Sequence, residues 1–285
     1  MNVLRSTNIF YVIFLLLSTI FVGRMDAEES DHLFFIGIMQ DKKGLARKYT
    51  PLVNYLKNYG ISVKLVGFHS YRDAAIKFKN GKIDAMFAGS GVAGAMIIKK
   101  LAYPLVRPVH DGNWSTYWAV VIVPESTTDF KMTPEYMRPK RIICSALASS
   151  GEFFCRAFLG ESQKLLIAGN HGNAIAALSR GAADIAVVKN RVWDQIKEEY
   201  PNLKKVAQDY GQNPDSTLIF SVNVNRDLVK KVKDALLNLK ECKSIDAEAL
   251  KKRLGICGYI VTEKKDFKHT LSLLKKAGVD KDFKF

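Results

Sequence analysis

The sequence has little of several features that would narrow its function at once. Its 285 residues include only 4 cysteines and 8 prolines, and acidic residues are scarce, with 28 Asp and Glu against 43 Lys and Arg. A hydrophobic content of 48% excludes a disordered chain and leaves enough apolar material for one or two compact cores. The formal net charge of +15 favours anionic partners such as phosphates, acidic membrane surfaces or nucleic acid, although a solvated basic surface explains it equally well.

Motifs of the common enzyme classes are missing as well. The chain has no GxSxG, HExxH, P-loop or GxGxxG pattern, and no Cys or His spacing that is typical of a zinc site. Ser150 and His171 could be imagined as a nucleophile and its base, but no acid that would orient the histidine follows from the sequence. We therefore expect no enzymatic activity, no cofactor and no bound metal.

Only one apolar run is long, and it lies near the N-terminus. Ile9–Val22 follows Arg5 and is broken only by a Ser-Thr pair. This run is short for a bilayer span of about 20 residues and is typical of a signal peptide. We expect residues 1–27 to direct export to the periplasm; an uncleaved anchor is the alternative, because Met25-Asp26-Ala27 fits the cleavage rule poorly. We expect no nucleic-acid partner, because the protein is expected to be exported and its Lys and Arg residues are spread along the chain rather than concentrated in one stripe.

The cysteines are few enough for their pairings to be enumerated. In an oxidising compartment, three complete pairings of Cys144, Cys155, Cys242 and Cys257 are open. Cys242 and Cys257 bracket a helix-like segment near the C-terminus and are candidates for a disulfide. Cys144 and Cys155 lie in apolar surroundings, where buried free thiols fit the sequence at least as well.

Strand-like and helix-like segments alternate from residue 33 onwards. The first series comprises Leu33–Met39, Tyr49–Tyr59, Val63–Val66, Asp73–Phe78, Ile83–Phe87 and a helix through Lys100. The second begins after Thr116–Pro124 and comprises strands at Arg141–Ser145, Leu165–Ala168 and Asp184–Val188, with helices ending at Leu159, Ser179 and Glu199. Two such series predict an α/β fold with two lobes, each a mostly parallel sheet flanked by helices.

The chain crosses between the predicted lobes twice. We expect it to enter the second lobe near residues 119–124 and to return near 217–222, where Thr217–Val224 reads as a further strand before a mainly helical remainder. This assigns residues 28–120 and 220–285 to lobe 1 and residues 121–219 to lobe 2. Ligands in such folds bind at the carboxyl ends of strands, in the cleft between the lobes.

Several segments, taken in order, resemble a known family. They are PLVNYL at Pro51–Leu56, SYRDAAIKFKNGKIDAMFAG at Ser70–Gly89, RPVHDGNWSTYWAVVIV at Arg107–Val123, ASSGEFFCRAFL at Ala148–Leu159 and GNHGNAIAAL at Gly169–Leu178. With these segments the chain resembles the phosphate, phosphite and phosphonate substrate-binding proteins of ABC transporters, a PhnD-like group of type II periplasmic binding proteins. The resemblance implies lobes that close over an oxyanion, delivery to a membrane permease and no chemistry on the ligand; we expect a monomer.

The clearest candidate ligand segment is Ser149-Ser150-Gly151. It lies between a strand and a helix, where hydroxyls and free N–H groups converge at a helix N-terminus and favour a phosphate-like anion. An ordinary helix cap is the alternative. The family usually has Ser-Thr-Ser-Gly here, so Ala148 removes one hydroxyl.

Further candidates come from the resemblance. His171 stands in a Gly-x-His context that matches the family's ligand histidine, and Tyr71 matches a family tyrosine that could donate a hydroxyl or simply pack. Ser90 follows the glycine of the next turn and could also donate. Tyr117 lies at the crossover, where a hinge or cleft-wall role competes with the core.

One departure from the family concerns charge. Lys189-Asn190 stands where many relatives have Asp or Asn. An acid there could pair with the ammonium of an aminoalkyl phosphonate, whereas Lys189 adds positive charge for a plain oxyanion unless it points to solvent. We therefore expect poor recognition of aminoethylphosphonate. The expected function is capture of a phosphonate, phosphite or phosphate for an ABC importer; the alternative is a sensor that reports an anion to a membrane signalling protein.

Overall fold

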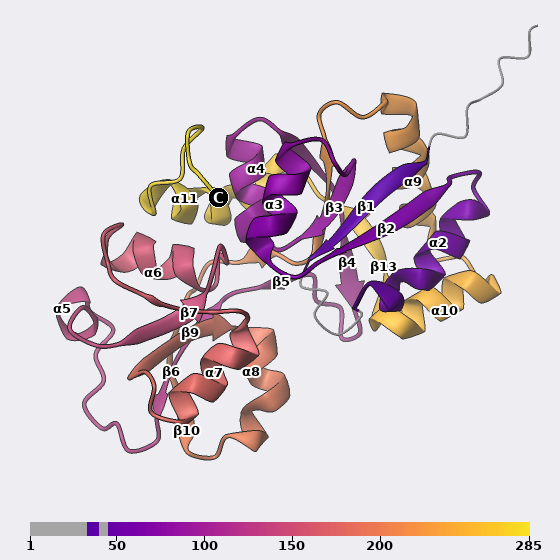
Figure 1. Cartoon of the computed structure of the whole chain (residues 1–285). Helices are drawn as coiled ribbons and strands as arrows, with labels where there is room; N and C mark the ends of the chain where they lie inside the picture. The colour runs from indigo at the N-terminus through magenta and orange to yellow at the C-terminus, as the bar shows by residue number, and fades with distance from the viewer. Residues whose placement is uncertain (1–32, 40–44) are drawn as a thin grey trace, which may run out of the picture. The chain divides into compact units, whose positions relative to one another are not determined.

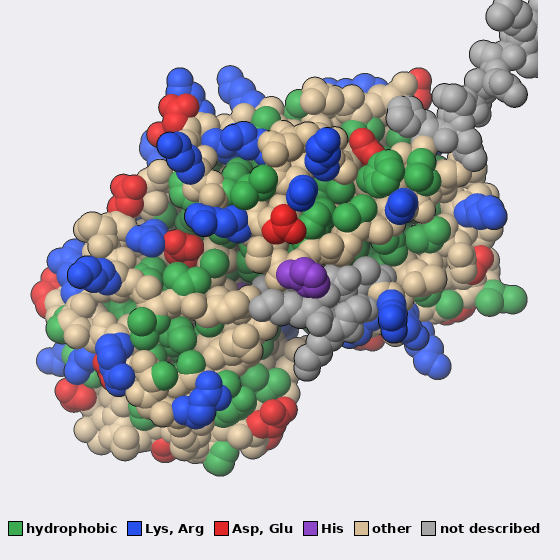
Figure 2. Space-filling model, viewed as in Figure 1, with side chains coloured by type: hydrophobic (Ala, Val, Ile, Leu, Met, Phe, Trp, Pro, Cys, Tyr) green, Lys and Arg blue, Asp and Glu red, His purple; other side chains and the backbone are tan. Residues whose placement is uncertain are grey.

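The computed structural model describes residues 33–39 and 45–285 (Figure 1). The expected signal peptide at residues 1–27 lies outside the described residues, as does segment 40–44. Within the described part of the chain, no helix has the length and apolar character needed to span a membrane. On the face shown in Figure 2, Lys and Arg side chains are scattered rather than gathered into one stripe.

The first sheet is built from both ends of the described chain. Its six strands run in the order β13-β4-β12-β3-β1-β2. They are β1 (Phe34–Met39), β2 (Val63–Phe68), β3 (Ala85–Ala88), β4 (Ala102–His110), β12 (Thr217–Ser221) and β13 (Ile256–Val261). β1 pairs in parallel with β2 and β3, as the alternation of strands and helices predicts, whereas β12 and β4 pair antiparallel with their neighbours.

The second sheet is built from the middle of the chain. Its order is β10-β6-β9-β7-β8. Its strands are β6 (Ala119–Pro124), β7 (Ile142–Ser145), β8 (Leu166–Ala168), β9 (Ile185–Lys189) and β10 (Leu203–Gln208). β7 runs parallel to β8 and β9, and β6 runs antiparallel to β9 and β10. A ribbon of β5 (Thr116–Tyr117) and β11 (Asn213–Pro214) lies on the two connections between the sheets.

Both sheets are more mixed than the mostly parallel sheets that the sequence predicts. The sequence patterns miss β4, β10 and β13, and these strands contribute much of the antiparallel pairing. β4 contains Pro104 and Pro108, which hide a strand pattern because proline lacks a ladder donor. The segment after residue 224 is mainly helical, as expected, and β13, which forms one edge of the first sheet, is the strand within it that the sequence patterns miss.

The helices cover the sheets (Figure 1). They are α2 (Thr50–Lys57), α3 (Tyr71–Lys79), α4 (Ser90–Ile98), α5 (Pro134–Met137), α6 (Glu152–Leu159), α7 (His171–Ser179), α8 (Asn190–Ile196), α9 (Arg226–Asn238), α10 (Ile245–Leu254) and α11 (Lys268–Lys276), with 3-10 turns at Leu45–Tyr49, Lys197–Glu199 and Lys264–Phe267. Several start at polar caps: Ser70 accepts from the Asp73 N–H at α3, and Asn170 accepts from the Asn173 N–H at α7. Such caps satisfy N–H groups that a helix leaves open.

α11 packs against two clusters of buried apolar residues, one beside the first sheet and one beside the second. It contacts both α4 and α6. Leu274 of α11 is buried in the apolar cluster that includes the α4 residue Val92, while Leu273 is buried in the cluster around Cys155 of α6. The helix that follows Ser149–Gly151 is therefore packed against a helix that follows the first sheet's β13.

The cysteines are free thiols in the structure. Cys242 Sγ lies 3.4 Å from Ser244 Oγ, and Cys257 Sγ lies 3.5 Å from Asp111 Oδ1. The candidate Cys242–Cys257 disulfide is thus not formed here, because β13 directs Cys257 toward the end of β4 while Cys242 lies beyond α9, beside the cap of α10. Cys144 and Cys155 are buried, in agreement with the free-thiol interpretation.

Candidate ligand-binding site

Three of the predicted site residues form a closed ring of hydroxyl groups. Ser90 is the first residue of α4, Tyr117 belongs to β5, and Ser149 lies in the loop between β7 and α6. Ser90 Oγ is 2.6 Å from Ser149 Oγ and 2.7 Å from the Tyr117 hydroxyl, which is itself 2.8 Å from Ser149 Oγ. Each hydroxyl carries one proton, so each can donate once around the ring. The three hydroxyls link α4 to the β7–α6 loop, and each already has hydrogen-bond partners within the ring.

The backbone also comes close at this contact. A Cβ atom added to Gly91 would lie 2.2 Å from the Leu147 carbonyl oxygen and 2.8 Å from the Ser149 nitrogen. Leu147 has a φ of 51°, in the left-handed region, and its N–H donates to Glu152 Oε2 at 2.9 Å. Gly151 packs on β7, where an added Cβ would lie 2.9 Å from the Ser145 carbonyl oxygen. Gly151 therefore allows close packing of the loop.

Ser150 differs from Ser149 because its side chain has no partner. Its Oγ is fully buried and makes no hydrogen bond in the described structure. No partner among the described residues is found for the backbone N–H of Ser149 or Ser150. A buried donor without a hydrogen-bond partner destabilises the folded protein. The unpaired Ser150 hydroxyl, just before α6, is therefore a candidate to donate to a bound ligand.

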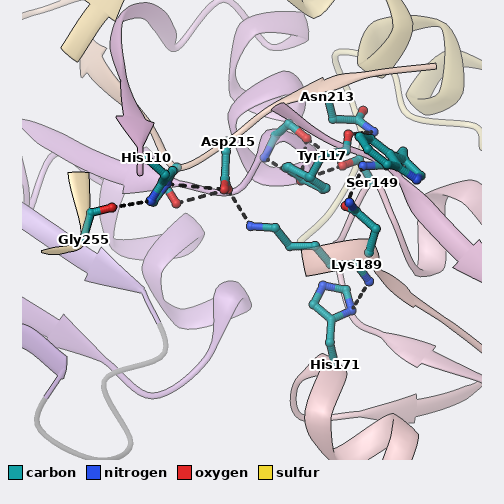
Figure 3. Close-up of polar contacts among 12 residues, drawn as sticks. His110, Tyr117, Ser149, His171, Lys189, Asn213, Asp215 and Gly255 are labelled. Carbon is teal, nitrogen blue, oxygen red and sulfur yellow. Dashed lines mark hydrogen bonds and ion pairs between the residues drawn. The ribbon is translucent and has the colours of Figure 1, made fainter. Parts of the chain in front are cut away.

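His171 begins α7 and is 8% exposed. Its Nδ1 accepts the backbone N–H of Lys189 at 3.3 Å (Figure 3). Burial, together with the nearby Lys189 ammonium, lowers the pKa of His171 to about 3. The imidazole is therefore neutral at pH 7, its proton sits on Nε2, and this Nε2–H remains available to donate.

Lys189 points inward, toward an acid that sequence patterns do not identify. Its Nζ lies 2.6 Å from Asp215 Oδ1 and 4.4 Å from the centre of the Tyr117 ring (Figure 3). The side chains of Lys189 and Asp215 are 19% and 4% exposed. His110 Nε2 is 3.7 Å from Asp215 Oδ2, and His110 Nδ1 is 3.2 Å from the Gly255 carbonyl oxygen. Burial lowers the pKa of His110 despite the attraction of Asp215, so this histidine is neutral at pH 7.

Asn190 and Tyr71 complete the predicted set. Asn190 is 2% exposed; its Oδ1 accepts the Trp118 N–H at 3.1 Å, while its Nδ2 has no partner in the described structure. Tyr71 is half-buried at the start of α3, and burial raises its pKa with added contributions from Tyr117 and Asp215. Contacts link Ser90, Tyr117, Ser149, Lys189 and His171, and Ser150, Gly151 and Asn190 adjoin these residues in the chain, whereas Tyr71 is related to the cluster only by its electrostatic interaction with Tyr117 and Asp215.

Asp215 and His110 are the residues that sequence reasoning missed. Asp215 follows β11 on the return connection and directly precedes Ser216, whose φ is 39°. The available signal was a single acid just before the strand at which the chain returns to the first sheet. Nothing in the sequence shows that this acid meets Lys189, because the pairing depends on how the two connections lie together.

The charges of the cluster largely cancel. Lys189 and Asp215 neutralise one another and both histidines are neutral, so Ser150 Oγ, His171 Nε2 and Asn190 Nδ2 are uncharged donors. Arg191 adds one positive charge nearby, with its guanidinium 4.0 Å from the centre of the Trp114 ring. In the described part of the chain, no cluster of His, Cys, Asp or Glu is suited to a metal ion. The arrangement can bind an acceptor-rich anion.

A family model described as "ABC transporter, phosphonate, periplasmic substrate-binding protein" matches residues 36–267, which is most of the chain. The chain belongs to this family. Members are substrate-binding transport proteins rather than enzymes; a small ligand, a membrane permease and an extracytoplasmic location follow from membership. No curated protein matches the chain.

Solved structures confirm the two-lobe α/β fold of this phosphonate-family binding protein. XAC2383 from Xanthomonas citri, bound to ATP, is 15% identical, with a TM-score of 0.71 over 87% of this chain and 98% of that one. PhnD1 from Prochlorococcus marinus, in complex with methylphosphonate, is 18% identical, with a TM-score of 0.69 over 87% and 99%. A binding protein of an ABC phosphonate transporter from Pseudomonas aeruginosa is 14% identical, with a TM-score of 0.69 over 86% of both chains.

Proposed function

We propose that the protein captures a phosphorus oxyanion, such as a phosphonate, phosphite or phosphate, for an ABC importer. The observation that carries this proposal is a pair of buried donors without partners in the described structure, Ser150 Oγ and Asn190 Nδ2, together with the Nε2–H of His171, a residue that is 8% exposed. They stand after β7, β8 and β9, three neighbouring strands of the second sheet. Carboxyl ends of parallel strands are the usual place for a ligand in such folds.

The chemistry of these donors suits a tetrahedral oxyanion. Each is a neutral O–H or N–H group, and the open N–H groups of Ser149 and Ser150 add donors at the start of α6. An anion with several oxygens can accept hydrogen bonds from more than one of these donors at once. Glu152, the acid in the first turn of α6, is held by Arg156 at 3.0 Å, so its charge is compensated.

Ligands of the structural neighbours agree with this class. The PhnD1 structure holds methylphosphonate and the XAC2383 structure holds ATP, so both ligands present phosphorus-bound oxygens. A chloride ion is bound in a second structure of XAC2383. Nothing in the comparisons favours the alternative of a sensor module.

The other predicted residues take supporting roles in this proposal. Ser90, Tyr117 and Ser149 hold the framework through their hydroxyl ring, Gly151 lets the loop pack, and Tyr71 lines the site. We propose that the lobes follow the expected division, residues 28–120 and 220–285 for lobe 1 and residues 121–219 for lobe 2, except that β6 (Ala119–Pro124) belongs whole to lobe 2 and β12 (Thr217–Ser221) whole to lobe 1. We also propose export by residues 1–27 and a monomeric state.

Calorimetric titration of the purified protein tests the function. The panel contains phosphate, phosphite, methylphosphonate, 2-aminoethylphosphonate and ATP, with sulfate and acetate as controls, on protein freed of carried-over ligand by partial unfolding and refolding. We expect saturable binding of at least one phosphorus oxyanion and a Tm increase of several degrees at 100 times its Kd. Binding of none of them, or equal binding of sulfate and acetate, would contradict the proposal.

A further inference from the structure

Lys189 makes the two contacts by which proteins usually bind the ammonium group of a ligand. We propose that Lys189 fills a cation subsite with its own ammonium and thereby selects phosphorus oxyanions that carry no amino group. This inference rests on the proposed function, because it concerns the same site.

The subsite is built from a carboxylate and an aromatic face. Lys189 Nζ lies 2.6 Å from Asp215 Oδ1 and 4.4 Å from the centre of the Tyr117 ring. A buried carboxylate paired with an ammonium forms a strong, charge-assisted hydrogen bond, and a ring face at this distance attracts a cation. Ser216 Oγ also donates to Asp215 Oδ1 at 3.2 Å, so this carboxylate oxygen already accepts two hydrogen bonds, one of them from the Lys189 ammonium.

The subsite adjoins the proposed anion donors. The backbone N–H of Lys189 is the group that holds His171 Nδ1, so one residue orients an anion donor and supplies the ammonium. Tyr117, whose ring faces that ammonium, bonds through its hydroxyl to Ser149, next to Ser150. Figure 3 shows the Lys189 side chain reaching from the side of His171 toward Asp215.

Two kinds of ligand should therefore be treated differently. An aminoalkyl phosphonate anchored at the anion donors would bring its ammonium against that of Lys189, with the carboxylate already occupied. Like charges in a partly buried site repel, and selectivity by repulsion is a common device in recognition. Methylphosphonate, phosphite and phosphate have no cationic group and avoid this repulsion.

Removing the lysine should open the subsite. In Lys189→Ala, Asp215 would be left as a buried carboxylate without its counter-ion, which is a costly arrangement. The ammonium of 2-aminoethylphosphonate could then replace that of the lysine and restore the pair. The variant should bind 2-aminoethylphosphonate more tightly than wild type does. Its affinity for methylphosphonate should not rise, because that ligand has no ammonium to pair with Asp215.

The experiment is calorimetric titration of methylphosphonate and 2-aminoethylphosphonate into four forms of the full chain: wild type, Lys189→Ala, Lys189→Met and the double variant Lys189→Ala/Asp215→Asn. Lys189→Met keeps the apolar length of the side chain in case the alanine variant fails to fold. Lys230→Ala is the charge-matched control, since Lys230 is exposed and pairs with Asp234 on α9. Circular dichroism checks that each form is folded.

We expect wild type and Lys230→Ala to prefer methylphosphonate by at least tenfold. Both single Lys189 variants should shift that ratio toward 2-aminoethylphosphonate by at least tenfold, and the double variant should lose the shift. Equal binding of both ligands by wild type, or an unchanged ratio in folded Lys189 variants, would overturn the inference while leaving the proposed function intact. Absence of any phosphorus oxyanion binding by wild type would overturn the proposed function itself, and this inference with it.

Discussion

The hydroxyl oxygens of Ser90 and Ser149 lie 2.6 Å apart, although 59 residues separate them along the chain. Ser90 begins a helix that follows a strand of the first sheet, and Ser149 follows a strand of the second. Both are fully buried, and the Tyr117 hydroxyl closes the ring. This contact fixes the β7–α6 loop, and with it the position of Ser150.

The energetic coupling of Ser90 and Ser149 can be measured directly. A double-mutant cycle of Ser90→Ala, Ser149→Ala and the double variant should show a coupling of about 1 kcal/mol in urea unfolding. The reason is that either single change leaves a buried hydroxyl short of a partner. Additive single effects would show that the two hydroxyls do not interact.

Close packing at Gly91 predicts a large cost for a single methyl group. In Gly91→Ala the new Cβ would meet the backbone of Leu147 and Ser149, which cannot rotate away, so we expect a loss of about 1–3 kcal/mol in the free energy of unfolding. Gly89→Ala is the matched control, because its Cβ would meet nothing within 4 Å. That variant should lose no more than about 1 kcal/mol. Equal losses in both variants would contradict the close approach.

Burial of neutral His171 predicts a pH dependence of stability. The folded pKa of about 3 lies below the ordinary value of 6.5, so the unfolded chain takes up a proton before the folded one as pH falls below 6.5. Stability is retained above pH 6.5 and should fall by up to about 1.4 kcal/mol per pH unit below it. Urea unfolding between pH 7.5 and 4.5 should show a shallower fall for His171→Gln. Identical slopes would contradict a buried neutral histidine.

The cysteines can be assigned by thiol labelling. Because Cys242 is half-exposed and Cys257 exposed, both should react in the native protein, whereas buried Cys144 and Cys155 should react only after unfolding. Hydrogen bonds from Ser244 lower the pKa of Cys242, so it should be labelled first. Failure to label either Cys242 or Cys257 without reductant would instead support the disulfide that the sequence suggests.

The parallel parts of the fold could be predicted because their pattern is local. Strands such as Phe34–Met39 and Ile185–Lys189 are continuous apolar runs followed by helices, and the structure has them where the sequence predicts them. β4, β10 and β13 carry prolines, lysines or a glycine, so their strand character depends on neighbours distant in the sequence. Their antiparallel pairing could not be derived from local periodicity.

The residues of the candidate site also differ in whether local sequence patterns could indicate them. Ser150 and His171 stand at strand-to-helix junctions, where local patterns direct attention. Asp215 could not be found in this way, because its importance comes from Lys189, a residue on a different connection. The same contact bears on what the sequence left open about the direction of Lys189: its ammonium is paired with buried Asp215 rather than directed to solvent.

The central claim is that Ser150 donates to a bound phosphorus oxyanion. The most direct test is the affinity of Ser150→Ala for methylphosphonate by calorimetry, with Ser162→Ala, an exposed serine in the loop after α6, as the control. Loss of one donor to a charged acceptor should weaken binding about tenfold or more, while Ser162→Ala should bind like wild type. An unchanged affinity in folded Ser150→Ala would contradict the account.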